Sequence, residues 1–266
     1  MSVTAPTRRV GELLRDWRQR RRLSQLDLAV EAEVSTRHLS FVETGRSKPS
    51  RELVLHLAEH LDVPLRDRNG LLLAAGYAPV YRETALDDAA MAPVHAALDK
   101  ILSGNEPFPA VIVDRAWNLV TANRPALSVL TDGVSRALLA PPVNALRVSL
   151  HPDGLAPRIA NFAEYSAHLL TRLQRQAALS PDPQLDALAA ELRAYPGVAN
   201  PPPVAEDPAT LLFVPLRLRT STGELSFFST LATFGTALDI TLAELAIESF
   251  FPADKATEAA LRAAFD

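Results

Sequence analysis

The chain has 266 residues, a formal net charge of −4 and no cysteine. Disulfides and cysteine-based metal or redox sites are therefore excluded, and the length predicts one large or two modest domains. No apolar run reaches the roughly 18 residues of a membrane-spanning helix, and Arg8 and Arg9 are not followed by the apolar stretch of a signal peptide. We therefore expect a cytoplasmic protein without membrane partners.

Charge is distributed unevenly along the chain. Residues 1–78 hold 13 Lys and Arg against 10 Asp and Glu, a net charge of +3, whereas residues 79–266 hold 14 against 21, a net charge of −7. The basic excess lies in the N-terminal part, as a surface that binds nucleic acid requires. Because the excess is small, we expect modest DNA affinity for one domain and a need for dimerisation.

The first predicted helix runs from Arg9 to about Arg22, with apolar residues at helical spacing. A second and a third helix are predicted within residues 24–44, joined by a short turn. Ser24 is a good N-cap for the second helix, with Asp27 as capping-box partner, and Ser35 can cap the third. A helix, a short turn and a second helix followed by a basic loop indicate a DNA-binding motif.

The third predicted helix presents polar and basic residues outward, while Leu39 and Val42 form its narrow inner face. Short exposed helices of this kind fit the major groove, where side chains must reach base edges. Five residues are predicted to read bases, with His38 at the margin of the set: Thr36, Arg37, His38, Ser40 and Phe41.

Four residues that flank this helix are predicted to contact phosphates: Arg18, Gln25, Arg46 and Lys48. Glu43 is acidic in a helix that approaches DNA. We therefore expect it to hold the following loop, through Arg46 or backbone donors. Two more helices are predicted, at residues 51–61 and from Pro64 to Gly76.

Residues 9–78 resemble the helix-turn-helix domain of the XRE family of Cro/C1-type repressors. The resemblance is carried by an ordered series of residues: Ser24-Gln25, Ala29, Val34-Ser35, Leu39, Glu43-Thr44-Gly45-Arg46 and Lys48-Pro49-Ser50. It implies sequence-specific binding to double-stranded DNA. A dimer on an inverted-repeat operator is expected, because one short helix reads too few bases.

The remaining elements are predicted from hydrophobic pattern and turn residues. A connector at residues 79–107 contains a helix at 86–102. Strands are predicted at 108–114 and 117–121, joined as a hairpin, and later at 211–219, 225–234 and 245–251. Helices are predicted at 124–130, 161–178, 182–195 and 253–265, with a loop or linker at Asn200–Pro203; residues 143–150 fit either a helix or a strand.

Strands at both ends of this half with helices between them predict an antiparallel five-stranded sheet with packed helices, a PAS-like arrangement in an α+β chain. Four segments resemble the MmyB-like ligand-binding domain of actinobacterial transcription regulators: FPAVIVDRAWNLVTAN, NALRVSLHPDGL, FVPLRLRTSTGELSFFSTLATFGT and TLAELAIESFFPAD. The resemblance implies a pocket for a long-chain, fatty-acid-like ligand. The expected domains are 1–78 for DNA binding, 79–107 as connector and helix, and 108–266 for ligand binding.

Apolar and aromatic side chains are concentrated in the C-terminal strands, where most must form core and some are expected to line a pocket. Arg147, between Leu146 and Val148, is the best candidate to bind an anionic head group, because a guanidinium can hold a carboxylate with two hydrogen bonds. The other expected ligand contacts are Asn123, His151, Phe213, Phe227 and Leu231.

No catalytic constellation is found, since G-x-S-x-G and glycine-rich phosphate-binding motifs are both missing from the sequence. His56 and His60 have the spacing of metal ligands, but no third ligand is evident. We therefore expect no enzyme activity, no metal and no cofactor. The sequence predicts a homodimeric, ligand-responsive transcription regulator. Two alternatives stay open: a C-terminal half that only dimerises, and an enzyme domain fused to a DNA-binding module.

Overall fold

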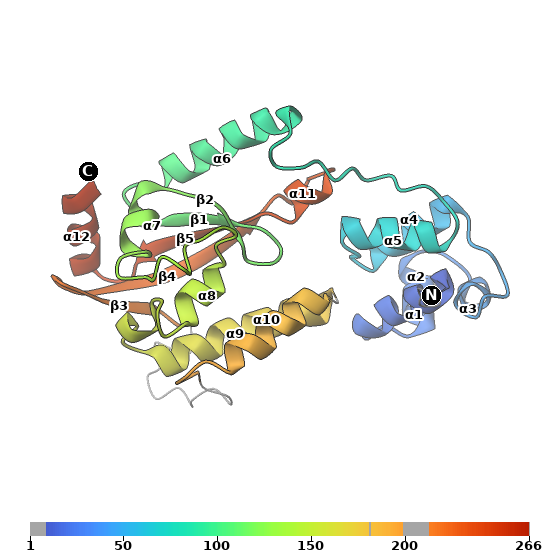
Figure 1. Cartoon of the computed structure of the whole chain (residues 1–266). Coiled ribbons are helices and arrows are strands. Elements are labelled where there is room, and N and C mark those ends of the chain that lie inside the picture. Colours follow the sequence, from blue (N-terminus) through green and yellow to red (C-terminus); the bar gives the residue numbers. More distant parts are fainter. Residues whose placement is uncertain (1–8, 181, 199–212, 266) are drawn as a thin grey trace, which may run out of the picture. The chain divides into compact units, whose positions relative to one another are not determined.

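The structure is a computed structural model that describes residues 9–180, 182–198 and 213–265 (Figure 1). The expected loop at Asn200–Pro203 and the first two residues of the strand expected at 211–219 lie outside these ranges. The chain divides into two compact units. One contains Met1–Thr84 together with Thr236–Ala243, and the other contains Ala85–Gly235 together with Glu244–Asp266.

The first unit is helical, as the sequence predicts. Its helices are α1 (Val10–Arg20), α2 (Gln25–Glu31), α3 (Thr36–Glu43), α4 (Arg51–His60), α5 (Leu65–Ala74) and α11 (Ile240–Ala243). One apolar core joins α1 to α5, and its largest fully buried side chains include Leu14, Leu28, Leu39, Leu57 and Leu72. This core fixes α3 against the other helices.

Local capping defines both ends of the helix-turn-helix motif. The Ser24 hydroxyl accepts a hydrogen bond from the Asp27 amide at 3.1 Å, and the Asp27 carboxylate accepts one from the Ser24 amide at 2.8 Å. The Ser35 hydroxyl caps α3 by accepting from the His38 amide at 3.1 Å. The helix ends at Glu43, and Gly45, two residues later, has a φ of +73°, the left-handed conformation that turns the chain into the basic loop.

Helix α11 belongs to the first unit although it lies between two strands of the second unit in the sequence. Asp239 caps it by accepting from the Thr241 amide at 2.9 Å, and its other carboxylate oxygen accepts from the Thr84 hydroxyl at 2.6 Å. The Ile240 amide donates to the Arg82 carbonyl at 2.8 Å. The sequence pattern predicted no helix at residues 240–243, and residues 108–266 were expected to form one domain.

The second unit combines a sheet with helices, which confirms the expected α+β class. Its strands are β1 (Ala110–Val113), β2 (Leu119–Ala122), β3 (Leu216–Thr220), β4 (Gly223–Thr233) and β5 (Ala246–Pro252). All its neighbouring strands are antiparallel, in the order β2-β1-β5-β4-β3. Its α-helices are α6 (Ala92–Gly104), α7 (Arg124–Val129), α8 (Ala145–Leu150), α9 (Phe162–Leu179), α10 (Pro183–Arg193) and α12 (Lys255–Phe265).

Two features of this unit refine the sequence prediction. The ambiguous segment 143–150 is the helix α8, because the Asn144 side chain caps it by accepting from the Arg147 amide at 3.2 Å. Within the described residues β3 begins only at Leu216, which pairs with Phe227 of β4. The expected hairpin of β1 and β2 and the strand β5 are confirmed.

One face of the sheet forms the core with α8, α9 and α10, and α9 and α10 lie side by side (Figure 1). Across the strands, Val111, Glu248 and Leu231 stand opposite one another in register. Phe250, two residues after Glu248, points to the same face because side chains alternate along a strand. No described helix has both the length and the apolar character needed to cross a membrane.

Candidate DNA-binding surface and ligand cavity

The first turn of α3 is exposed. Thr36, Arg37 and His38 are open to solvent, whereas Ser40 and Phe41 are half-buried one turn later. The Arg37 guanidinium lies over the Phe41 ring, 5.3 Å from its centroid. This contact leaves the donors at the edge of the guanidinium free to meet a base edge. These five residues therefore share one stretch of helix, and their base contacts stay a prediction.

The basic loop after α3 carries the two exposed cations expected at phosphates. The Arg46 guanidinium lies 6.0 Å from the Phe41 ring centroid, and the Lys48 ammonium lies 5.3 Å from the Tyr77 ring centroid. The Tyr77 hydroxyl donates to the Pro49 carbonyl at 3.0 Å and so fixes that ring. Both cations thus have a preferred direction while remaining open to an anion.

Arg18 and Gln25 have a different environment from the other predicted phosphate contacts. The Arg18 side chain is buried, and it donates to both carboxylate oxygens of Glu43, at 2.7 and 2.9 Å. Its third nitrogen donates to the Leu23 carbonyl at 2.8 Å. The Gln25 amide donates to Glu43 at 2.7 Å. This geometry favours a structural role for Arg18. Glu43 was expected to hold the following loop through Arg46, but its partners are Arg18 and Gln25.

The electrostatics of this cluster match its geometry. Burial alone would raise the pKa of Glu43, but hydrogen bonds from Arg18 and Gln25, with the charges of Arg18 and Arg15, outweigh burial and lower it. The hydrogen bond to Glu43 raises the pKa of Arg18. The carboxylate therefore stays ionised and ties α3 to α1 and α2.

The second unit contains a cavity of about 300 Å³, at the lower end of the range for small-molecule sites. It lies between the sheet and the helices α7, α8 and α9. Most of its wall is apolar, and the larger side chains are Leu119, Leu127, Leu130, Leu146, Leu155, Leu169, Leu216 and Phe250. Such a wall favours an apolar occupant.

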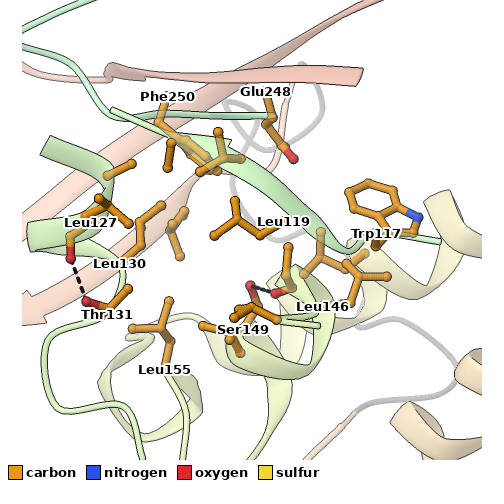
Figure 2. A pocket seen from close by; sticks show the side chains of 18 of the residues that line it. Trp117, Leu119, Leu127, Leu130, Thr131, Leu146, Ser149, Leu155, Glu248 and Phe250 are labelled. Carbon is orange, nitrogen blue, oxygen red and sulfur yellow. Dashed lines mark hydrogen bonds between the residues drawn. The ribbon is translucent and has the colours of Figure 1, made fainter. Parts of the chain in front are cut away.

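One end of the cavity carries a charged side chain. Figure 2 shows Glu248 and Trp117 on one side of the view, and Leu127 and Leu130 on the opposite side. Arg172 connects the polar pair from outside the lining, because it donates to the Glu248 carboxylate at 2.8 Å and lies 4.6 Å from the Trp117 ring centroid. The polar end is thus held by an ion pair stacked on an aromatic ring.

Trp117 is held in an uncommon backbone conformation. Its φ of +67° lies in the left-handed region, which bulky residues rarely adopt. Its indole nitrogen donates to the Gln176 side chain at 2.8 Å, and its carbonyl accepts from the Ala145 amide at 2.8 Å. Strain of this kind gathers at sites where a side chain must be aimed, here at the wall of the cavity.

Arg147, the expected anion anchor, does not line the cavity. It donates twice to the Glu191 carboxylate, both times at 2.8 Å, and these hydrogen bonds lower the pKa of Glu191. The Tyr195 hydroxyl donates to the same carboxylate, and burial together with this bond raises the pKa of Tyr195 to about 12. The guanidinium therefore already has the carboxylate partner that a ligand was expected to supply.

The two other polar candidates also lie outside the cavity lining. Asn123 caps α7 by accepting from the Ala126 amide at 3.0 Å and also bonds to the backbone at Ala110 and Phe108. His151 packs edge-on against Tyr195, with ring centroids 4.9 Å apart. Their hydrogen bonds and packing indicate structural roles.

The apolar candidates are spread over the sheet. Phe227 is fully buried in the core, while Phe213 and Leu231 are 46% and 48% exposed. None of the three lines the cavity, although Leu231 stands opposite the lining residue Glu248. Glu248, Trp117 and Tyr165 line the cavity and were not predicted from the sequence. A glutamate within the apolar strand AIESFF was the available signal, since a buried carboxylate needs a partner.

Comparison with known families agrees with this architecture. A model of the MmyB-like transcription regulator ligand binding domain matches residues 94–264. The chain belongs to the MmyB-like transcription regulators. A model of a helix-turn-helix domain matches residues 9–71, the region that resembles the XRE family. This MmyB-like regulator therefore joins a DNA-binding unit to a ligand-binding domain.

Other comparisons add little. The chain matches no curated protein. A solved structure of an RNA-binding light-oxygen-voltage receptor aligns with 12% identity and a TM-score of 0.23, covering 96% of this chain and 60% of that one. The chain thus spans 60% of the length of that receptor chain. At this TM-score the similarity carries no argument about fold or function.

Proposed function

We propose that this MmyB-like regulator binds a long-chain, fatty-acid-like amphiphile in the cavity and thereby changes its affinity for an operator. The mostly apolar wall of the roughly 300 Å³ cavity, with the carboxylate of Glu248 towards one end, is the observation that carries this proposal. Burial of an acyl chain contributes about 0.8 kcal/mol for each methylene group. A chain can therefore bind well even with few polar contacts.

The DNA-binding part of the proposal assigns base contacts to the exposed turn of α3 and phosphate contacts to Arg46 and Lys48. A helix of eight residues reads only a short sequence. Two copies on an inverted repeat, with half-sites about 34–36 Å apart or a multiple of that distance, supply the missing selectivity. A footprint over one unrepeated half-site would contradict the homodimer.

The chain path supports a link between ligand and operator. Glu248 and Phe250 line the cavity from β5, and the segment just before β5 forms α11 in the first unit. A ligand that displaces β5 would therefore act on a strand that continues into the DNA-binding unit. The ligand shifts operator affinity only if it binds two states of the protein unequally.

The test compares operator affinity of the full chain after delipidation, with and without added dodecanol or dodecanoate. We expect one of the two lipids to change the affinity. In Asp239→Ala, which loses the cap of α11 and the bond to Thr84, lipid binding should persist while the change in operator affinity shrinks. Tight lipid binding with constant operator affinity in the unmodified chain would make the cavity structural.

The two alternatives predict different cavities. A domain that only dimerises needs a filled core, whereas an enzyme needs convergent titratable groups in an open cleft. The wall of the cavity contains one ionisable acid, Glu248, and one phenol, Tyr165. This composition favours ligand binding over both alternatives. Dimerisation through the second unit remains part of the proposal, because two-fold operators need two-fold proteins.

A further inference from the structure

The polar groups of the cavity wall include more hydrogen-bond acceptors than donors. The Ser149 hydroxyl donates to the Ala145 carbonyl at 2.8 Å, and the Thr131 hydroxyl donates to the Leu127 carbonyl at 2.5 Å (Figure 2). Their protons are therefore engaged, and only their oxygen lone pairs remain. Glu248 is an acceptor when ionised. The wall thus offers several acceptors and few donors.

Tyr165 is the exception. Its hydroxyl has no hydrogen-bond partner among the described residues. Tyr165 also lines the cavity, and its hydroxyl is not fully covered by protein atoms. Burial, with the nearby charge of Glu248, raises the pKa of this phenol, so it keeps its proton at neutral pH and can donate.

No lysine, arginine or histidine belongs to the described wall of the cavity. Arg172 contacts the wall residues Glu248 and Trp117 from outside the lining, and one of its nitrogens donates to Glu248. Another of its nitrogens is unpaired but covered by protein atoms. That nitrogen therefore cannot reach a ligand in the cavity without a rearrangement of the packing around Trp117.

These observations constrain the head group of a ligand. An ionised carboxylate would enter beside the Glu248 carboxylate without a cation of its own, and an unpaired buried charge is strongly unfavourable. A hydroxyl group fits both polar side chains, because it can donate to Glu248 and accept from Tyr165. Both lie on elements that meet at the cavity, β5 and α9.

We propose that the cavity selects a long-chain ligand with a neutral, hydroxyl-bearing head group, with Glu248 as acceptor and Tyr165 as donor. The inference rests on the proposed function, since it assumes that the cavity binds an amphiphile. It differs from the expectation of an anionic head group at Arg147. The acyl chain would extend from the polar end towards Leu127 and Leu130.

The experiment titrates the delipidated full chain with dodecanol and with dodecanoate at neutral pH, using calorimetry. These probes share the same chain length and differ in the head group. We expect dodecanol to bind at least about tenfold more tightly than dodecanoate. The hydroxyl of dodecanol can form hydrogen bonds with the polar wall groups, whereas dodecanoate brings an unpaired charge into the cavity. Equal affinity, or tighter binding of dodecanoate, would overturn the inference.

Variants separate the two polar side chains. Tyr165→Phe should weaken dodecanol about fivefold, the size of one lost neutral hydrogen bond, with little effect on dodecanoate. Glu248→Gln offers a carboxamide donor and removes the charge, so it should narrow the difference between the probes. Tyr195→Phe is the matched control for Tyr165→Phe, because Tyr195 does not line the cavity and its hydroxyl donates to Glu191.

The outcomes also distinguish this inference from the proposed function. The head-group assignment alone is refuted if both probes bind the unmodified chain with the same affinity. It is also refuted if the ratio of dodecanol affinity to dodecanoate affinity is unchanged in both Tyr165→Phe and Glu248→Gln. Failure of both probes to bind refutes the amphiphile cavity itself, and the inference with it. A dodecanol preference that is lost in either variant and kept in Tyr195→Phe supports both the head-group assignment and the proposed function.

Discussion

The guanidinium of Arg18, on α1, holds the buried carboxylate of Glu43, on α3, with two hydrogen bonds of 2.7 and 2.9 Å. The pair joins the first helix of the unit to the end of the helix proposed to read DNA. Both side chains are almost fully covered, so their mutual charge is only weakly screened by solvent. Loss of Arg18 would leave the buried carboxylate with only the more distant guanidinium of Arg15, at 3.5 Å, and loss of Glu43 would leave a buried guanidinium without its carboxylate.

Arg18→Ala should therefore lower the free energy of unfolding of the first unit by about 3–5 kcal/mol, the usual cost of breaking a buried pair. Urea unfolding followed by circular dichroism measures this change. The double variant Arg18→Met/Glu43→Leu should recover much of the loss, since no buried charge remains. A single variant as stable as the unmodified chain would show that the pair is not important for stability.

The lowered pKa of Glu43 predicts a dependence of stability on pH. The folded-state pKa lies below the unfolded value of roughly 4.3, so the stabilisation is present above that pH and lost as pH falls through the folded pKa. Thermal unfolding should therefore show a steeper loss of stability in acid for the unmodified chain than for Glu43→Gln. Parallel curves would contradict this assignment.

Much of the fold was predictable from sequence because its signals are local. Caps such as Ser24 and Ser35, and apolar residues at helical or strand spacing, predicted α1 to α5 of the first unit and the five strands of the second. The start of β3 and the membership of α11 were not found, because they depend on strand pairing and on contacts between distant segments.

The ligand cavity was less predictable than the fold. Arg147 has the right chemistry for an anion, but its carboxylate partner Glu191 lies 44 residues away and gives no local signal. Phe227 and Phe250 occur in similar apolar strands, yet only Phe250 lines the cavity. Which apolar residue faces a cavity depends on register and packing in three dimensions, and sequence pattern reports only the face of the strand.

Gly11 lies where α1 approaches the end of α3. A Cβ atom at this position would stand 2.2 Å from the Val42 carbonyl oxygen and 2.9 Å from that of Glu43. Gly11→Ala should therefore destabilise the unit by about 1–3 kcal/mol through overpacking, although alanine is the better helix former. Chemical unfolding of the full chain gives the value.

Gly70 provides the matched control for that substitution. It lies inside α5, and a Cβ atom there would meet nothing within 4 Å. Gly70→Ala should stabilise the unit by up to about 1 kcal/mol, the difference in helix propensity. If both alanine variants change stability in the same direction, the close approach of α1 and α3 does not decide the effect at Gly11.

Arg147→Ala tests whether the expected anion anchor touches the ligand. Both side chains of the Arg147–Glu191 pair are more than a third exposed, so the variant should lose less than about 1 kcal/mol of stability. Because Arg147 does not line the cavity, dodecanol and dodecanoate affinities should change by less than about twofold. Leu130→Trp, which fills the cavity, is the positive control and should abolish binding of both lipids. A selective loss of dodecanoate binding in Arg147→Ala would restore the assignment of Arg147 as the anion anchor.

Arg37 and Lys48 should differ in how they affect operator binding, because one is proposed to read a base and the other a phosphate. Arg37→Ala should cost about 1–3 kcal/mol on the operator and relax the preference at one base position. Lys48→Ala should weaken operator and random DNA alike and reduce the slope of log affinity against log salt by about one. Fluorescence anisotropy at several salt concentrations measures both, with Arg51→Ala, exposed at the start of α4, as a comparison for the loss of any nearby cation. If Arg37→Ala weakens operator and random DNA equally, Arg37 contacts a phosphate and does not read a base. If the salt slope is unchanged in Lys48→Ala, Lys48 does not contact DNA.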